Sequence, residues 1–259
     1  MPSFAPAAGR DVPAQPPPTG VRPCCDGSRS PRPTCSACVA RGLTICRALP
    51  PEELVEMEQL STVIRIEAGA TLFDQGDEAG SVYNLTAGTI RLSKTLADGR
   101  RQITGFVLPG DFIGLSSRAT HPYSAEAIGP CQLCRFNAAT LGRMADRLPR
   151  LEHELFDRAR DELDAAHDQM LLLGRKSPRE KVASFLLELA HRCERWGQRP
   201  DRVSLDMTRT DIADYLGLTI ETVSRTLTRM KRDGMIALPS SNEIVFLRLD
   251  AVRTLAEGS

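Results

Sequence analysis

Five of the eight cysteines in this 259-residue chain stand in two tight groups. Cys35, Cys38 and Cys46 form the first group, and Cys131 and Cys134 form the second. Thiolate sulfur is a preferred ligand for zinc and for iron-sulfur clusters, whereas thiols in a reducing cytosol rarely pair as disulfides. The grouping therefore predicts a metal or redox site. Because Cys35 to Cys38 and Cys131 to Cys134 are two CxxC pairs, a tetrahedral zinc site is one form that it could take.

The other three cysteines are expected to have no part in that site. Cys24 and Cys25 lie in residues 1–33, a proline-rich stretch with almost no large apolar side chain, which we predict to be a disordered lead-in. Adjacent side chains point in divergent directions, so this pair does not easily hold one metal. Cys193 lies on a leucine-rich helical segment and is predicted to be a small core residue.

Residues 208–225 carry the signals of a helix-turn-helix. Thr208 and Asp211 predict a capping box at the start of one helix, Gly217 fits the turn, and Thr219 caps a second helix. The alternative is a helical hairpin with an ordinary solvated face. We favour DNA binding because the caps, the turn glycine and a polar helix face agree.

The second of these helices carries four residues that we predict to contact DNA. Its apolar residues face the core, which leaves Glu221, Ser224 and Arg225 near its N-terminus, where a reading helix enters the major groove. Arg225 can pair bidentately with guanine, Glu221 can accept from cytosine N4, and Ser224 can meet a thymine or a phosphate. Arg229 is suited to a phosphate contact.

Two further regions must position these sites. Between residues 63 and 136, short apolar runs alternate with glycine turns, which predicts a small antiparallel β domain. After Pro149 a helix without glycine or proline runs to Leu173, flanked by charged residues such as Arg158. Its apolar residues recur at steps of three and four, the spacing of a seam for a parallel partner helix. The alternative is a helix packed on its own β domain, which predicts a wider apolar face. The seam residues are Phe156, Ala159, Leu163, Ala166, Met170 and Leu173.

Helices alternate with short turns from Ser177 and Pro178 to about Asp233, and two apolar runs then flank residues 239–242 as a terminal hairpin. Three helices and a hairpin make a winged helix-turn-helix. We therefore predict an α+β chain in four parts. They are the lead-in (1–33), a cysteine loop and antiparallel β-roll (34–148), a dimerisation helix (149–174) and a winged helix-turn-helix domain (175–259).

Composition narrows the function classes. The formal net charge is zero, so any DNA affinity must come from a local basic surface. Apolar stretches stay far below the roughly 18 residues that span a membrane, and the first residues do not read as a signal peptide. We therefore expect a cytoplasmic protein with no membrane partner. We expect no enzyme, because the histidines show no pairing of nucleophile and base; they are His121, His153, His167 and His191.

With a β-roll, a long helix and a winged helix in this order, the chain resembles the CRP/FNR superfamily of bacterial transcription regulators. Residues 221–225 read Glu-Thr-Val-Ser-Arg, which is similar to the Glu-x-x-Ser-Arg of the FNR branch rather than to the cyclic-AMP receptor branch. A cyclic-nucleotide pocket in this family would need an arginine for the phosphate and a glutamate near the ribose. The chain has Gly-Leu-Ser at 114–116 and Tyr-Ser-Ala at 123–125, so we expect no cyclic nucleotide.

The resemblance also implies a cofactor. The FNR branch holds a [4Fe-4S] cluster with three cysteines before the roll and one late in it, which here would be Cys35, Cys38, Cys46 and Cys134. Cys131 is the alternative fourth ligand. The gap between Cys38 and Cys46 is longer than the family's shorter form and looks like that of rhizobial and related members. Zinc held by the two CxxC pairs is the alternative cofactor and would leave Cys46 idle.

The function implied by this resemblance is oxygen-responsive control of genes for low-oxygen metabolism. A homodimer would bind double-stranded DNA at a palindrome similar to TTGAT-N4-ATCAA while its cluster is intact, and would contact RNA polymerase to activate transcription. Loss of the cluster to oxygen would weaken the helix seam and with it the DNA affinity. Three alternatives compete: a family regulator with structural zinc or other redox thiol sensing, a redox carrier using the same cysteines, and a cyclic-nucleotide-responsive regulator.

Overall fold

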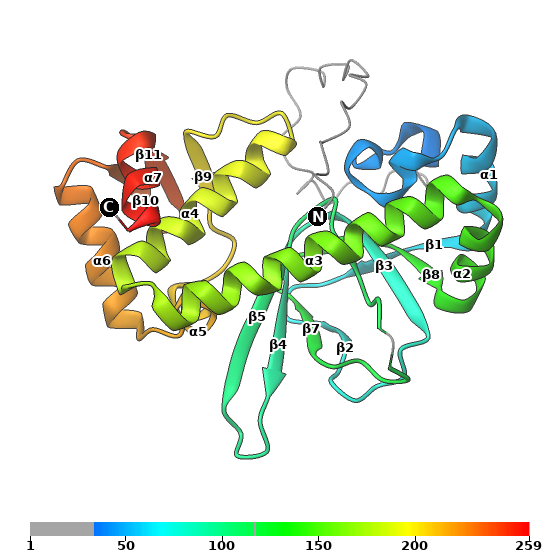
Figure 1. Cartoon of the computed structure of the whole chain (residues 1–259), viewed down its shortest axis with the longest axis horizontal. Helices are drawn as coiled ribbons and strands as arrows, with labels where there is room; N and C mark the ends of the chain where they lie inside the picture. The colour runs from blue at the N-terminus through cyan, green and yellow to red at the C-terminus, as the bar shows by residue number, and fades with distance from the viewer. Residues whose placement is uncertain (1–33, 117, 259) are drawn as a thin grey trace, which may run out of the picture.

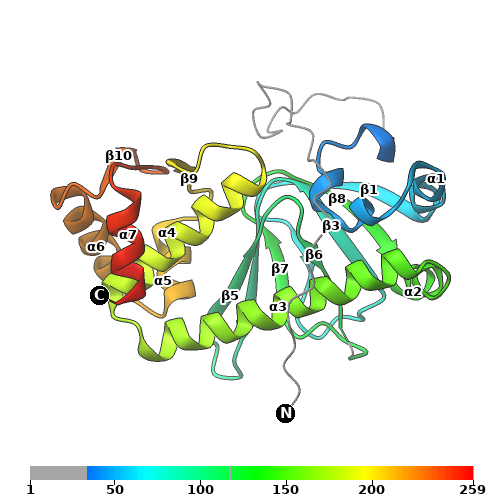
Figure 2. The ribbon, with the colours of Figure 1, turned by 45° about the horizontal axis from the view of Figure 1, so that its top comes forward.

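A single long helix, α3 (Pro149–Arg175), connects the two halves of the chain (Figure 1). The computed structural model describes residues 34–258 except residue 117, so the predicted lead-in with Cys24 and Cys25 lies outside the described residues. A β-roll lies beside the N-terminal half of α3, and a helical domain lies at its C-terminal end (Figures 1 and 2). In this described part, no helix is both long enough and apolar enough to cross a bilayer.

The β-roll consists of two four-stranded antiparallel sheets, which confirms the predicted fold of this part. One sheet has the order β1 (Ser61–Ile66), β8 (Cys131–Asn137), β3 (Ser81–Ala87) and β6 (Phe112–Ile113). The other has the order β2 (Thr71–Phe73), β7 (Ser124–Ala127), β4 (Ile90–Thr95) and β5 (Arg101–Val107). Apolar side chains of both sheets, among them Leu85, Ile90 and Leu133, fill the space between them.

The cysteine segment covers the outer side of the first sheet. It forms three short 3-10 helices, η1 (Cys35–Ala37), η2 (Arg41–Leu43) and η3 (Ile45–Ala48), and continues into α1 (Pro51–Leu60). A second helix, α2 (Ala138–Arg147), follows β8 and leads into α3. These elements share a core around Ile45, Met57, Phe136, Met144 and Leu151. Neither α1 nor α2 was among the predicted elements.

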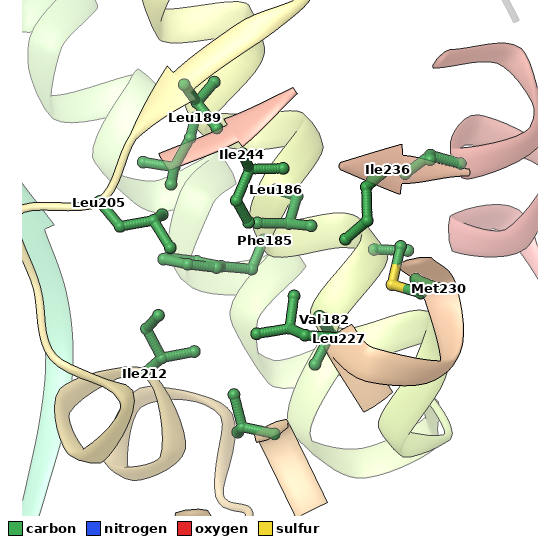
Figure 3. Packing of buried hydrophobic residues seen from close by; sticks show 14 of the residues in the cluster. Val182, Phe185, Leu186, Leu189, Leu205, Ile212, Leu227, Met230, Ile236 and Ile244 are labelled. Atoms are coloured by element: carbon green, nitrogen blue, oxygen red, sulfur yellow. The ribbon is translucent and has the colours of Figure 1, made fainter. Parts of the chain in front are cut away.

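The C-terminal domain is a winged helix-turn-helix around one apolar core (Figure 3). Leu186, Ile212, Leu227, Ile236 and Ile244 bring together side chains from its helices and strands in that core. The predicted hairpin is joined by a third strand, and a last helix follows it; both were missed in the sequence. In chain order the elements are α4 (Pro178–Arg195), β9 (Arg202–Ser204), α5 (Arg209–Leu216), α6 (Ile220–Arg232), β10 (Ile236–Ser240), β11 (Glu243–Phe246) and α7 (Leu249–Glu257).

The predicted seam of α3 faces away from the chain's own roll. All six seam residues are exposed, with exposed fractions of 59% for Phe156, 56% for Leu163 and 62% for Met170. The helix instead buries Leu151 and Glu154 near its start. Packing on the chain's own β domain is therefore the wrong explanation of the seam, and an apolar stripe is left for a partner helix.

Candidate sensor pocket and nucleic-acid interface

The four thiols implied as cluster ligands line one pocket. Cys35 belongs to η1, Cys38 ends it, Cys46 lies in η3 and Cys134 lies in β8. The cavity has a volume of about 80 Å³, several times the roughly 10–15 Å³ that one water molecule needs. The fold thus brings together sulfur atoms from two segments that are far apart in sequence.

The position of Cys134 within the sheet explains why it reaches this pocket. Cys134 pairs with Val63 of β1 and Asn84 of β3, and residues directly opposite one another share a sheet face. Cys131 stands three positions earlier on the strand and therefore points to the other face. There its sulfur lies 3.4 Å from the Thr89 carbonyl oxygen, in the core of the roll. The structure separates Cys131 from the other thiols, which removes geometric support for it as fourth ligand.

Burial sets the acid-base chemistry of the pocket. It raises the pKa of all four thiols, and for Cys35 and Cys134 to about 12. For Cys134 the charges that the other three thiols would carry add to the effect of burial. The thiols are therefore neutral near pH 7 while no cation is bound. Because metal ligation requires thiolates, binding of a metal centre must release protons.

The arrangement of these side chains bears on the kind of metal centre. In the part of the chain that the structure describes, no three Cys, His, Asp or Glu side chains are placed to hold one metal ion. A tetrahedral zinc ion needs its ligands around a single point. In a [4Fe-4S] cubane each cysteine binds a different iron, so the thiolates surround the group instead. The four pocket thiols match the donor set of a cluster, and the two CxxC pairs do not meet, because Cys131 points to the other face of β8.

The second candidate site is the outer face of α6. Glu221, Ser224, Arg225 and Arg229 are all exposed there, while the opposite face of the helix packs into the domain core through Val223, Leu227 and Met230. Thr219 caps the helix by accepting from the Thr222 amide at 3.2 Å, which confirms the predicted cap. The structure thus brings the four predicted DNA contacts onto one solvated face.

The turn before α6 has the predicted chemistry too. Gly217 ends α5 in the left-handed conformation, at φ 60° and ψ 44°, which side chains with a Cβ rarely adopt. Thr208 and Asp211 form the predicted capping box of α5. The angle between the two helices is therefore determined by residues that also mark it in the sequence.

Comparisons with known proteins agree with this architecture. Residues 63–147 match the model of the cyclic nucleotide-binding domain, and residues 180–255 match that of the Crp-like helix-turn-helix domain. The nitrogen fixation regulation protein FixK of Bradyrhizobium diazoefficiens is 47% identical over 204 residues, which cover 79% of this chain and 86% of that protein. The chain belongs to the CRP/FNR family of transcription regulators.

Other CRP/FNR members support the same assignment. The transcriptional activator protein FnrL of Cereibacter sphaeroides is 38% identical over 227 residues, covering 86% of this chain and 91% of FnrL. The structure of FixK2 from Bradyrhizobium japonicum is similar with a TM-score of 0.72 and 35% identity, covering 77% of this chain and 98% of that one. CRP/FNR regulators bind DNA and act as dimers, and the chain is a regulator rather than an enzyme.

In this CRP/FNR regulator the winged helix-turn-helix domain forms ion pairs with the β-roll of the same chain. Arg91 of β4 lies between two carboxylates, 2.5 Å from Glu126 of β7 and 2.8 Å from Asp211 of α5. Asp211 is the N3 residue of the α5 capping box, so one carboxylate both accepts from the N-cap Thr208 and pairs with Arg91 of the roll. Arg192 of α4 forms a second such ion pair, with its Nη1 2.6 Å from Oδ2 of Asp111.

Two polar residues of the sensor pocket were missed in the sequence. Asn84 is buried in β3, and its Nδ2 donates to the Cys46 sulfur at 3.9 Å, while its Oδ1 has no hydrogen-bond partner among the described residues. Glu58 of α1 accepts from the Cys35 amide at 3.0 Å. A lone amide between Tyr83 and Leu85, in the middle of a strand, is the signal that could have found Asn84.

Proposed function

We propose that this chain is an oxygen-responsive transcription activator that holds a [4Fe-4S] cluster with Cys35, Cys38, Cys46 and Cys134. FixK-type members of the family lack clusters, so family membership alone does not carry the proposal. The proposal rests on one observation. Three thiols from the segment before the roll and one from its last strand, β8, line the same pocket. Four cysteine ligands are the usual complement of a cubane.

The residues around the pocket suggest how the site acts on the rest of the chain. A bound cluster would supply the chemistry that reacts with oxygen. The chain itself excludes water by burying Cys46 and supplies a donor to its sulfur from Asn84. Cys46 lies in η3, which contacts the beginning of α3. The segment that holds the ligands is therefore placed against the helix that carries the seam.

The DNA-binding half of the proposal follows from the exposed faces of α3 and α6. Two copies paired along the α3 seam would place two reading helices about one turn of DNA apart, which requires a palindromic site. The expected site is similar to TTGAT-N4-ATCAA, with Arg225 on guanine, Glu221 on cytosine, Ser224 on a thymine or phosphate and Arg229 on a phosphate. As an activator the dimer would also contact RNA polymerase, in the cytoplasm, without a cyclic nucleotide.

Anaerobic purification followed by iron, sulfide and zinc analysis tests this function. We expect about four irons and four sulfides per chain, a broad visible absorbance band that falls in air, and a parallel fall in affinity for the palindrome. A colourless protein with one zinc per chain would replace the cluster by a structural zinc site. A cluster that decays without any change in DNA affinity would contradict oxygen control.

A further inference from the structure

A buried carboxylate joins the cysteine segment to α3. Glu154 lies in the second turn of α3, and only 6% of its surface is exposed. Its Oε2 accepts from Arg47 Nε at 2.8 Å, and its Oε1 accepts from Arg158 Nε at 2.9 Å. Arg47 directly follows Cys46, whereas Arg158 stands one helical turn further along α3. A buried carboxylate is costly unless its oxygens are paired, and here each oxygen has its own guanidinium.

Arg158 extends this link across the gap between Cys38 and Cys46. Its Nη2 donates to the carbonyl oxygen of Leu43 at 2.6 Å. Only 11% of the Arg158 side chain is exposed, which corrects its predicted place on the solvated flank of the seam. A Cβ on Gly110, whose φ is 95°, would lie 2.7 Å from the Leu43 Cβ. The segment between the cysteines is thus held by α3 on one side and by a tight turn of the roll on the other.

The two arginines differ in how easily they leave Glu154. The Arg158 pair lies within one helix at i and i+4 and stays together wherever the cysteine segment goes. The Arg47 side chain is 47% exposed, so the cost of its release comes from the Glu154 oxygen that it leaves unpaired rather than from the guanidinium itself. When the contact between Glu154 and Arg47 opens, α3 keeps its own ion pair between Glu154 and Arg158.

We propose that Glu154 is a positioning residue that passes the state of the thiol pocket to the dimer-forming face of α3. Phe156, the first residue of the seam, stands between Glu154 and Arg158 in the sequence. A cysteine segment docked through Arg47 and Leu43 fixes this turn of α3. The metal-free chain already docks the segment in part, and a bound cluster would shift the balance further toward the docked arrangement. The inference rests on the proposed function of the pocket, because the state that it passes on is the presence of the cluster.

The docking itself can be tested on the metal-free chain with Glu154→Gln. Hydrogen exchange at the Thr44, Arg47 and Leu49 amides, which are bonded within the segment, should become about tenfold faster. Glu152→Gln is the matched control, since it makes the same change at an exposed position of α3 and should leave these amides at the wild-type rate. Wild-type exchange in Glu154→Gln would overturn the inference.

The coupling is measured by sedimentation, as the ratio of dimer dissociation constants without and with the cluster. Glu154→Gln should lower this ratio about tenfold while iron and sulfide content stays at the wild-type level. An unchanged ratio would overturn the inference. If the wild-type chain takes up no iron and sulfide, the proposed function has failed instead, and the exchange experiment still decides the docking.

A second pair of variants guards against misfolding. Should Glu154→Gln lose its circular dichroism signal, Arg47→Gln removes the releasable half of the link from a half-exposed position. It should raise the same exchange rates and lower the same ratio, and Arg150→Gln, at an exposed position of α3, should do neither. Wild-type values in a folded Arg47→Gln would overturn the inference.

Discussion

The two ends of α3 carry sites that are built in opposite ways. The reading face at the C-terminal end lies on one helix, α6, whose caps and turn are encoded within about twenty consecutive residues. The sensor pocket at the N-terminal end exists only where η1, η3, β3 and β8 meet. A locally built site keeps its shape when distant contacts change. A site built from distant segments is dismantled by losing one of them, which suits a sensor.

The two ends also treat charge differently. The reading face keeps Glu221, Arg225 and Arg229 in water, where they remain available for DNA. The sensor end buries its polar groups, with Asn84 at 1% and Glu154 at 6% exposed. Because unpaired buried polar groups are costly and exposed ones are not, substitutions at the sensor end should act on assembly, and those at the reading end on affinity.

Cys134→Ser is expected to have the largest effect, which is complete loss of cluster assembly. Serine oxygen is a poor ligand for iron-sulfide, and the described pocket supplies four thiols. The same loss is expected for serine at Cys35, Cys38 or Cys46. Iron and sulfide content after anaerobic reconstitution measures it.

Cys131→Ser is the matched control, because the residue lies on the same strand but on the opposite face of the sheet. It should retain iron and sulfide at the wild-type level, as should Cys193→Ser in the other domain. Loss in Cys131→Ser together with retention in Cys134→Ser would reverse the ligand assignment and the face assignment of β8.

The sequence predicts the locally encoded reading end of the molecule better than the sensor end, which is built from distant segments. The order of roll, long helix and winged helix, the caps at Thr208 and Thr219 and the turn at Gly217 were all predicted, because each rests on residues close in sequence. The helix α7 was missed, since a nine-residue amphipathic helix after a hairpin has only a weak periodic signal.

The sensor pocket was predictable only in part. Cysteines can be recognised by type and spacing, but the set Cys35, Cys38, Cys46 and Cys134 follows from the family resemblance. The structure places these four thiols in one pocket and Cys131 outside it. Glu154 and Arg158 could not be assigned, because helical periodicity places charged residues of a long helix in solvent. Only the folded cysteine segment, which covers that side of α3, turns them into buried partners.

The raised pKa of the pocket thiols predicts an effect of about a thousandfold on alkylation. Near pH 8 the metal-free chain should react with iodoacetamide at Cys35 and Cys134 about 10³ times more slowly than the urea-unfolded chain, because the thiolate is the nucleophile. A raised folded-state pKa stabilises the fold fully below pH 9, and this contribution is lost as pH rises toward 12.

Peptide mapping by mass spectrometry across pH 7 to 10 measures these rates. The unfolded chain should level off above pH 9, whereas the folded chain should still gain about tenfold per pH unit at both residues. Levelling of the folded chain near pH 9 would show that the pocket thiols are as hydrated as ordinary ones.

Leu163→Glu should weaken the dimer at least about a hundredfold with the cluster in place. Burying a leucine contributes about 1.5–3 kcal/mol, two copies are lost per dimer, and two carboxylates then face each other. Sedimentation equilibrium measures the change. Ala165→Glu puts the same charge on an exposed position off the seam and should leave the dimer intact. Equal effects of the two variants would place the seam elsewhere on α3.

Arg225→Ala should cost about 1–3 kcal/mol on the palindrome and relax the preference for one guanine per half-site. Arg229→Ala, at the proposed phosphate contact, should weaken all sequences alike and lower the salt slope by about one unit per subunit. Titrating matched and guanine-substituted duplexes at two salt concentrations separates the two roles. If Arg225→Ala loses the same affinity on both duplexes, Arg225 does not read the guanine, and Glu221 or Ser224 provides the sequence specificity.

Asn84→Leu should have the smallest effect, and it acts on the lifetime of the cluster in air. The substitution keeps the branched shape and the number of heavy atoms of the side chain but removes the donor to the Cys46 sulfur. A hydrogen bond of this kind contributes about 0.5–1.5 kcal/mol, which corresponds to roughly two- to tenfold faster decay of the visible absorbance band.

Thr86→Val is the control for this last effect, because Thr86 lines the same pocket but donates to the Gln132 carbonyl oxygen at 2.9 Å rather than to sulfur. If both variants speed decay equally, polarity of the pocket rather than the bond to Cys46 protects the cluster. If only Asn84→Leu speeds decay, the single hydrogen bond from Asn84 of the sheet to Cys46 of the cysteine segment sets the lifetime of the cluster. Neither variant should change the DNA affinity of dimers whose cluster is intact.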